Sequence, residues 1–387
     1  MSQSVDFDQV LQRQHGDSMK WRRYQDQDVV PMWVADMDFA APQVVVDALQ
    51  QRVAEGVYGY GQVPEGLAEA LCHWYNRRYG WPIEPSWLVW LPGLVSGLHA
   101  VAKVFGEPGG GVMTHSPVYP PFLKVAERSD QQLIAVPMLE DNGEGQWQLD
   151  FAAMEQAITP ETRLFMFCNP HNPTGRVFRR EELEQVAEFC LKHDLLICSD
   201  EIHCDLVLEP ELQHISIASM SEDIAQRSIT LLAPSKTFNI AGLACSVAVI
   251  PNAKLRRQFN LQMMGLMPHV NILGYVAAQA AYEGGESWLE QLLDYLGENR
   301  QRLSNWLTQY PKLKMSLPEA TFLGWIDFRA YGQDYPARWL LKEAGVALSE
   351  GADFGLPGFA RINFGCPKAQ LEQALTRIDR VLQQSPA

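Results

Sequence analysis

Three polar residues with complementary chemistry follow apolar stretches of this chain that have the pattern of buried strands. Lys236 offers an amine, Asp200 a carboxylate and Asn172 an amide, and Ser235 adds a hydroxyl beside the lysine. The carboxyl ends of parallel strands share one edge of an open α/β sheet, so these side chains are expected to meet around one ligand. An amine held at such an edge can attack carbonyl groups, which is the Schiff-base chemistry of lysine. Taken singly, each residue has an ordinary alternative, namely a surface loop, a helix cap or a turn.

An amine, a carboxylate and an amide around one crevice match the requirements of pyridoxal phosphate. The amine binds the cofactor covalently, and the carboxylate keeps the ring nitrogen protonated so that the ring can accept electrons. The phosphate group needs backbone N–H groups at a helix N-terminus, which the glycine-led turn at residues 92–97 would supply. Tyr119 would give an aromatic face for the ring. A simple loop at 92–97 and a packing role for Tyr119 are the alternatives.

The region from about residue 85 to 250 alternates short apolar runs with amphipathic helical stretches. This alternation predicts a parallel sheet with helices on both faces. Proline at the start and glycine at the stop support a helix over 42–56, and another is predicted over 180–193. The apolar runs are residues 111–113, 164–168, 195–199, 229–233 and 246–250.

The pattern changes after about residue 285. A long helical stretch at 287–309 is followed by an alternating strand at 321–328 and a final helix at 368–384, which predicts a smaller α+β domain. Residues 30–39 have no place in the alternating core, so the N-terminal segment is expected to join that domain. The expected division is a large domain, residues 45–285, and a small domain formed by residues 1–44 and 286–387.

The composition limits the classes of function. A chain of 387 residues is too long for a single core, and 47% hydrophobic with 20% charged residues is ordinary for a soluble enzyme. A formal net charge of −15 argues against nucleic acid as a partner. The sequence has no apolar stretch of about 20 residues, so no membrane span is expected. The seven cysteines form no CxxC pair, so neither a disulfide framework nor a metal site is expected. With no apolar signal core at residues 1–10, the expected location is the cytoplasm.

Six motifs stand out along the chain: WVADMDF at 33–39, YGYG at 58–61, NPHNPTG at 169–175, SDEIH at 199–203, SKTFNIAGL at 235–243 and ARINF at 360–364. Together they resemble the fold-type I pyridoxal-phosphate enzymes. Within that group they resemble the aminotransferase-like cystathionine β-lyases, the maltose-regulon modulator and cystalysin-like carbon–sulfur lyase branch, over nearly the whole chain. The resemblance implies the aminotransferase-like fold type I: a large domain with a mostly parallel seven-stranded sheet flanked by helices, plus a smaller α+β domain.

The resemblance also assigns roles to individual residues. It implies that Lys236 is the catalytic lysine that carries the cofactor, and that Tyr119 stacks on the ring and takes part in catalysis. Arg361 would grip the substrate α-carboxylate with its planar fork, a role for which arginine is suited. The implied cofactor-binding residues are Lys236, Asp200, Asn172, His203, Tyr119, Leu94, Val95, Ser235 and, from the neighbouring subunit, Tyr60. The implied substrate-binding residues are Arg361, Asn172, Ala35 and Asp36.

Two positions depart from the pattern of many aminotransferases. Ala244 stands where an arginine often binds the cofactor phosphate, and His203 stands where a tyrosine often meets the ring 3-oxygen. Both substitutions occur in the β-lyase branch, so the expected activity is cleavage of L-cystathionine or a related S-substituted L-cysteine to a thiol (homocysteine), pyruvate and ammonia. The alternatives are an aminotransferase of the same fold and a regulatory transcription-factor-binding protein with incidental lyase activity. A homodimer with a small-molecule amino-acid substrate is expected, without nucleic acid or membrane partners.

Overall fold

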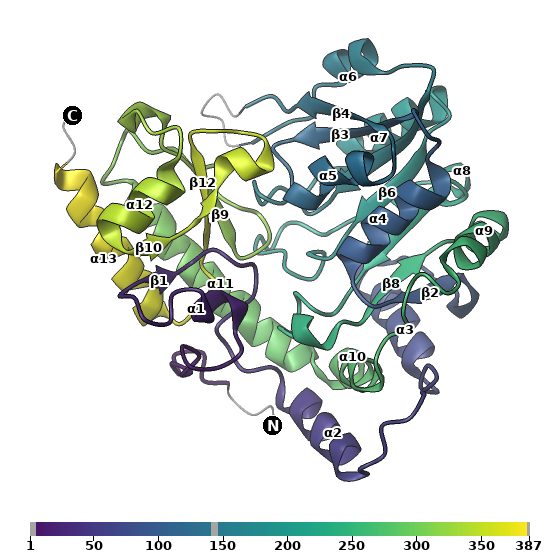
Figure 1. Cartoon of the computed structure of the whole chain (residues 1–387), viewed down its shortest axis with the longest axis horizontal. Coiled ribbons are helices and arrows are strands. Elements are labelled where there is room, and N and C mark those ends of the chain that lie inside the picture. The colour runs from purple at the N-terminus through teal and green to yellow at the C-terminus, as the bar shows by residue number, and fades with distance from the viewer. Residues whose placement is uncertain (1–4, 141–145, 385–387) are drawn as a thin grey trace.

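A seven-stranded sheet forms the centre of the larger part of the molecule. The computed structural model describes residues 5–140 and 146–384 (Figure 1). The strand order is β2-β8-β7-β6-β5-β3-β4; the neighbours from β7 to β4 pair in parallel, and β8 pairs antiparallel with both β7 and β2. The prediction of a mostly parallel seven-stranded sheet is therefore confirmed. The strands are β2 (Leu88–Leu91), β3 (Gly111–Ser116), β4 (Gln132–Pro137), β5 (Thr162–Cys168), β6 (Leu196–Asp200), β7 (Ser228–Leu232) and β8 (Ser246–Val249).

Helices cover both faces of this sheet, because its central strands are apolar on both sides. In β5, Leu164 and Met166 pack into a cluster with α4 and α5, whereas Phe165 and Phe167 pack into a second cluster with α7. This alternation follows from the two-residue period of a strand. The helices of this part are α2 (Gln43–Ala54), α3 (Leu67–Tyr79), α4 (Leu94–Phe105), α5 (Pro120–Arg128), α6 (Phe151–Ala157), α7 (Arg180–Lys192), α8 (Glu222–Ala225), α9 (Ala253–Met263) and α10 (Ile272–Gly284).

A second, smaller set of strands lies beside α11, α12 and α13 (Figure 1). Strands β11, β12 and β9 form an antiparallel sheet in that order, and β1 pairs in parallel with β10. The N-terminal segment thus lies against the C-terminal part of the chain, as expected for residues 30–39. The elements are α1 (Met19–Arg22), β1 (Val30–Pro31), α11 (Glu286–Leu307), β9 (Leu323–Asp327), α12 (Pro336–Ala344), β10 (Val346–Ala347), β11 (Ser349–Glu350), β12 (Phe359–Asn363) and α13 (Lys368–Gln384).

The predicted helices over 42–56, 180–193, 287–309 and 368–384 are confirmed as α2, α7, α11 and α13. The five apolar runs are confirmed as β3, β5, β6, β7 and β8, with one difference: Asp200 is the last residue of β6 and does not follow the strand. The sequence patterns did not predict β2 and β4, the two edge strands. Each contains a short apolar run, residues 88–91 and 133–136, but as edge strands both are only partly covered in the fold.

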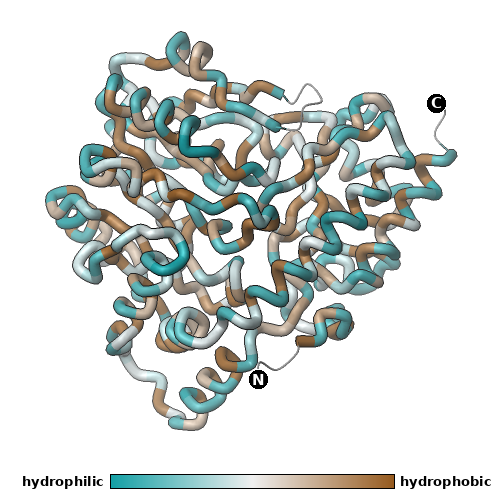
Figure 2. The backbone as a smooth tube through the Cα atoms, turned by 180° about the vertical axis from the view of Figure 1, so that it is seen from behind, coloured by the Kyte–Doolittle hydropathy of each residue, from teal (hydrophilic) through white to brown (hydrophobic). Residues whose placement is uncertain are grey.

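The hydropathy of the C-terminal helices and the state of the cysteines can be read from the structure. Figure 2 shows apolar and polar residues alternating along the helices that lead to the C-terminus, as amphipathic packing requires. All seven cysteines, which lie in the described part of the chain, are free, and all except Cys72 are buried. Among the described residues, no helix is both long and apolar enough to cross a membrane.

Candidate active site

A cavity of about 230 Å³ lies at the carboxyl edge of β5, β6 and β7. Cys168 and Asp200 are the last residues of neighbouring strands and pair in register, and Lys236 follows the next strand. The predicted meeting of strand-end side chains at one edge is therefore present in the structure. The lining residues are Ala35, Pro92, Gly93, Leu94, Val95, Ser96, Tyr119, Cys168, Asn172, Asp200, Ile202, His203, Ser235, Lys236, Ala241, Ala244, Cys245 and Ser246.

Lys236 presents its amine to this cavity from the loop after β7. Its Nζ donates to the carbonyl oxygen of Ala35. The next residue, Thr237, donates from Oγ1 to Asp205 Oδ2 at 2.8 Å, which ties the loop to the segment after β6. The pKa of Lys236 is lowered to about 8, mainly by burial and also by the Arg361 charge, against the opposing effect of Asp36 and Asp200. At pH 8 this lysine holds on the order of a hundredfold more free base than a solvated one.

Asp200 is a buried carboxylate without a cationic neighbour at contact distance in the described part of the chain. Its side chain is 4% exposed, and Oδ1 accepts the backbone N–H of Ile202 at 3.1 Å. Burial raises its pKa to about 7, although the Ile202 N–H and the Lys236 charge act to lower it. A carboxylate in this state is well suited to a bound group that brings its own positive charge or proton.

The N-terminus of α4 forms another wall of the cavity. Gly93 is the N-cap of this 12-residue helix, and the first intrahelical bond to its carbonyl comes from Gly97. The N–H groups of Leu94, Val95 and Ser96 therefore have no partner within the helix. Such N–H groups and the helix dipole favour an anion, and the Ser235 hydroxyl lies in the same lining.

Arg361 lies beside the cavity on the middle strand β12 and is 4% exposed. Its Nη1 donates to Asn172 Oδ1 at 2.9 Å, and Nη2 donates to the Trp33 carbonyl at 3.0 Å and to Ser349 Oγ at 3.2 Å. The guanidinium carbon also stands 4.8 Å from the centre of the Phe354 ring. All these partners are neutral, and burial lowers the pKa of Arg361 to about 10. A buried guanidinium held by neutral groups is prepared for a carboxylate.

Tyr119 and His203 also line the cavity and bring an aromatic ring and an imidazole to it. Tyr119 is the residue before α5, and burial raises the pKa of its phenol, so the hydroxyl stays protonated. Burial and the Lys236 and Arg361 charges hold the pKa of His203 well below its usual value, so its imidazole is neutral. In the described part of the chain, His203 Nδ1 has no hydrogen-bond partner, which leaves a polar atom for a bound molecule.

Three residues expected in the site differ in their placement. Ala35 lies in the cavity wall, but the Asp36 carboxylate faces Arg13 at 2.8 Å, behind that wall. Tyr60 is fully exposed and outside the cavity of its own chain. The expected substrate contact of Asp36 and the cross-subunit contact of Tyr60 stay predictions.

Some residues that hold the site were not found from the sequence patterns. Ser349 and the Trp33 carbonyl orient Arg361, and the Asn363 side chain binds the carbonyls of Val34 and Asp36. Two of these lie within motifs used for the resemblance, 33–39 and 360–364, so those motifs were the available signal. Ser349 lies in no motif, and only the pairing of β11 with β12 brings it to Arg361.

These features fit pyridoxal phosphate. The cavity offers an amine of lowered pKa, a buried carboxyl group in need of a cation or a proton, and a helix N-terminus with three N–H groups that have no partner within the helix. Lys236, Asp200 and the start of α4 would hold the aldehyde carbon, the ring nitrogen and the phosphate respectively. Ala244, in the left-handed conformation at φ 51°, lines the cavity without adding charge. The phosphate would therefore be bound by dipoles and hydroxyls.

The burial of Asp200 leads to a testable consequence for stability. Its folded pKa of about 7 lies above the ordinary 3.8, so the cofactor-free folded protein binds this proton more tightly than the unfolded chain. The contribution of Asp200 to the free energy of unfolding therefore falls as the pH rises from about 4 to 7. We expect Asp200→Asn to raise the free energy of unfolding of the cofactor-free protein at pH 8 by at most about 4 kcal/mol, seen as a higher thermal midpoint, and to have little effect at pH 4.

The matched control for this substitution is Asp194→Asn, since the Asp194 carboxylate is 94% exposed. Asp194→Asn is expected to leave the difference between the thermal midpoints at pH 8 and pH 4 the same as in the wild type. Equal midpoints for wild type and Asp200→Asn at pH 8, measured by calorimetry, would show that the buried carboxyl group carries no such cost.

The chain belongs to the aminotransferase class I and II family, whose model matches residues 27–378. It is 39% identical to cystathionine beta-lyase PatB of Bacillus subtilis, over 98% of this chain and 100% of that protein. The crystal structure of OvoB is similar with a TM-score of 0.96 and 48% identity, covering 98% of this chain and 100% of that one. Cystalysin from Treponema denticola, whose structure contains pyridoxal 5'-phosphate, is 32% identical with a TM-score of 0.94 and coverage of 98% and 99%. The predicted family and fold are confirmed.

Proposed function

We propose that this protein is a pyridoxal-phosphate-dependent carbon–sulfur β-lyase. Its substrate would be L-cystathionine or a related S-substituted L-cysteine, and its products a thiol, pyruvate and ammonia. The observation that carries the proposal is the shared cavity of Lys236, Asp200 and Asn172, with Arg361 bonded to Asn172. Similarity to PatB over the full length of both chains supports the lyase reaction in particular.

The cofactor and its binding residues follow from the cavity walls. When bound, pyridoxal phosphate supplies an electrophilic carbon for the substrate amine and an electron sink for the pair left at Cα. The Asp200 carboxylate would hold the proton on the ring nitrogen, and its burial makes that charge pair strong. Tyr119 would cover the ring, while the α4 N-terminus and Ser235 would bind the phosphate. Asn172 and His203 would meet the ring 3-oxygen.

Lys236 would move protons once the substrate amine has taken its place. Its lowered pKa makes a substantial fraction of the amine free base near pH 8, as a general base at Cα requires. The electron pair left by that proton expels the thiolate from Cβ, and the same amine can return the proton to the leaving sulfur. One group can serve both steps because Cα and Cβ are bonded neighbours. The released aminoacrylate then takes up water and hydrolyses to pyruvate and ammonia.

Arg361 would fix the substrate by its α-carboxylate. Its fork already points toward the cavity residue Asn172, and its other partners are a carbonyl and a hydroxyl that do not compete as anions. A carboxylate bound there would orient the Cα–H bond relative to Lys236, which is the positioning that intramolecular catalysis depends on.

An aminotransferase with the same residues is the alternative of the same family. Ala244 in the cavity wall, where many aminotransferases have a phosphate-binding arginine, favours the lyase. The test is pyruvate release from L-cystathionine, L-cysteine, L-cystine and S-alkyl cysteines with no keto acid present, with free thiol measured for the thioethers. We expect pyruvate and thiol from at least one thioether, with L-alanine as the control that lacks a leaving group. No pyruvate from any of them would refute the lyase proposal.

We also propose a homodimer. Large apolar side chains are exposed on two segments, including Val57 at 69%, Tyr60 at 110% and Met264 at 74%. Gly61 lies against Ile272, the first residue of α10, which follows the exposed segment at 261–266 along the chain. Exposed apolar patches of this kind mark contact surfaces, and a second copy that supplies Tyr60 to the phosphate region is the occupant that the resemblance favours. Sedimentation is expected to give a dimer, and a fully active monomer would contradict this.

The division into domains and the location in the cell are proposals of the same kind. The separate sheets support a large domain over residues 45–285 and a small one from 1–44 and 286–387. Seven free cysteines, six of them buried, support a reducing compartment such as the cytoplasm.

A further inference from the structure

One short segment, residues 33–39, touches both cationic residues of the site through its backbone. The carbonyl of Ala35 accepts from Lys236 Nζ, and the carbonyl of Trp33 accepts from Arg361 Nη2 at 3.0 Å. These two contacts connect residues 201 and 328 positions apart in the chain. The orientation of both cations therefore depends on where this segment is held.

The carbonyls of the alternate residues, Val34 and Asp36, are bound by the side chain of Asn363. Asn363 Nδ2 donates to the carbonyls of Val34 and Asp36, the latter at 2.7 Å, and its Oδ1 accepts the N–H of Gly365 at 2.8 Å. Asn363 is fully buried and lies two residues beyond Arg361 on β12. Because alternate carbonyls are fixed on one side, those of residues 33 and 35 are turned toward Arg361 and Lys236.

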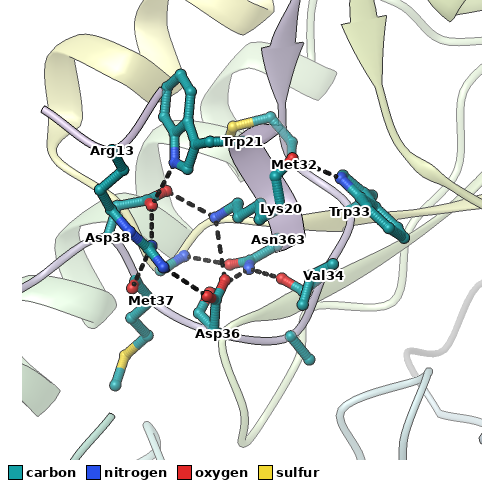
Figure 3. A network of polar contacts seen from close by, with 12 residues as sticks. Arg13, Lys20, Trp21, Met32, Trp33, Val34, Asp36, Met37, Asp38 and Asn363 are labelled. Atoms are coloured by element: carbon teal, nitrogen blue, oxygen red, sulfur yellow. Dashed lines mark hydrogen bonds and ion pairs between the residues drawn. The ribbon is translucent and has the colours of Figure 1, made fainter. Parts of the chain in front are cut away.

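Four charged side chains secure the same segment to the N-terminal arm (Figure 3). Lys20 Nζ lies 2.6 Å from Asp38 Oδ2 and 3.8 Å from Asp36 Oδ1. Arg13 binds Asp36 Oδ2 at 2.8 Å, also contacts the Asp38 carboxylate, and donates to the Met37 carbonyl at 3.1 Å. We call Arg13, Lys20, Asp36 and Asp38 the four-charge cluster.

Two members of the four-charge cluster, Lys20 and Asp38, are buried. Lys20 is 0% exposed and Asp38 3%, and Trp21 Nε1 adds a hydrogen bond of 2.8 Å to Asp38 Oδ1. Burial alone would raise the pKa of Asp38, but the charge and hydrogen bond of Lys20, with that of Trp21, lower it, so the carboxylate is ionised. Two cations and two carboxylates balance each other, and removal of one partner leaves a buried charge that is only partly compensated.

Resting on the proposed function, we propose that Asn363 and the four-charge cluster are positioning residues for Lys236 and Arg361. They line no part of the cavity, and they act by fixing segment 33–39 so that its carbonyls at 33 and 35 hold the two cations in the geometry for a bound amino acid. Asp36 has a second effect, because its negative charge acts on Lys236 through the cavity wall.

The charges that face Lys236 set the sign of this second effect. Asp36 and Asp200 favour the protonated amine, whereas Arg361 and burial disfavour it, and His203 is a neutral neighbour. Loss of the Asp36 charge therefore lowers the pH at which the nitrogen of Lys236 gains its proton.

The test uses Lys20→Met and Asp36→Asn in the cofactor-bound protein. Met keeps the length of the Lys20 side chain without its charge, and Asn keeps the shape of Asp36. The matched control is Arg300→Met, which removes a partly buried ion pair with Glu209 of 2.6 Å and a bond to the Pro318 carbonyl, away from segment 33–39. Two quantities are measured by absorbance: the dissociation constant of L-alanine, which binds but has no leaving group, and the pH midpoint of the bound cofactor.

We expect Lys20→Met to weaken L-alanine binding roughly tenfold, the loss expected when a hydrogen bond to a charged group is weakened. We expect Asp36→Asn to lower the pH midpoint by roughly half a unit. Arg300→Met should lower the thermal midpoint but change neither quantity. Neither readout requires lyase activity, and failure of the wild type to bind the cofactor would count against the proposed function instead.

Two outcomes would overturn the inference. The first is a folded Lys20→Met protein that binds L-alanine as the control does. If Lys20→Met does not fold, Asp36→Asn carries the test alone, and unchanged values of both its pH midpoint and its L-alanine dissociation constant would equally overturn it.

Discussion

Lys236→Ala is expected to abolish pyruvate formation from L-cystathionine and to remove the visible absorbance of a covalently bound cofactor. The substitution removes the Lys236 amine, which donates to the Ala35 carbonyl in the cavity wall. The same amine is the proposed general base at Cα, so this function is lost as well. General acid–base catalysis alone contributes about 10²–10⁴-fold, so a loss of at least about 10³-fold is expected. Pyruvate production and the absorbance spectrum measure the two effects separately.

The matched control is Lys254→Ala, which removes an exposed lysine at the start of α9 and should leave both quantities unchanged. The cofactor phosphate would still be bound at the α4 N-terminus, so the Lys236 variant is expected to retain cofactor without a covalent link. If borohydride reduction still fixed the cofactor covalently to the Lys236→Ala protein, another residue would be the attachment site.

Arg361→Ala is expected to lower kcat/KM for L-cystathionine by on the order of 100-fold or more. The guanidinium would make two charge-assisted hydrogen bonds to the α-carboxylate, and such bonds contribute about 1.5–3 kcal/mol each. Arg361→Lys should recover only part of the loss, because an ammonium group cannot form the planar two-point contact and cannot also reach Asn172 and Ser349. Steady-state kinetics on the three proteins measure these differences.

A second substrate makes the assignment of Arg361 specific. An S-substituted cysteamine has the amine and the sulfur but no carboxylate, so the wild type should strongly prefer the amino acid. In Arg361→Ala that preference should largely disappear, whereas Arg338→Ala, at an exposed position on α12, should keep it. A preference retained in Arg361→Ala would mean that another residue binds the carboxylate.

The central residues of the site could be predicted from the sequence because each stands at the end of an apolar run. Asp200, Asn172 and Lys236 each follow or end an apolar run, and the ends of parallel strands meet at one edge. The same periodicity predicted β5, β6 and β7, since strands buried on both faces are apolar throughout. The edge strands β2 and β4 were not predicted although each has a short apolar run, because a run of about four apolar residues does not by itself distinguish a strand from other buried segments.

The supporting residues depend on contacts that no local pattern encodes. Asn363 reaches Val34 across 329 positions, and the Trp33 carbonyl reaches Arg361 across 328. Lys20 reads in the sequence as one more lysine near the N-terminus, yet the fold buries it completely against Asp38. Such contacts arise only when β1 pairs with β10 and brings the N-terminal segment to the small sheet.

The fate of the substrate nitrogen tests the central claim most directly. The cofactor-bound protein is incubated with L-cystathionine carrying ¹⁵N in the amino group of its cysteine half, with and without a keto acid. A β-lyase releases the label as ammonia, in equal amounts with pyruvate and thiol, and needs no keto acid. Label found instead in the amino acid formed from the keto acid, with no thiol released, would show that the protein transfers amino groups and does not cleave carbon–sulfur bonds.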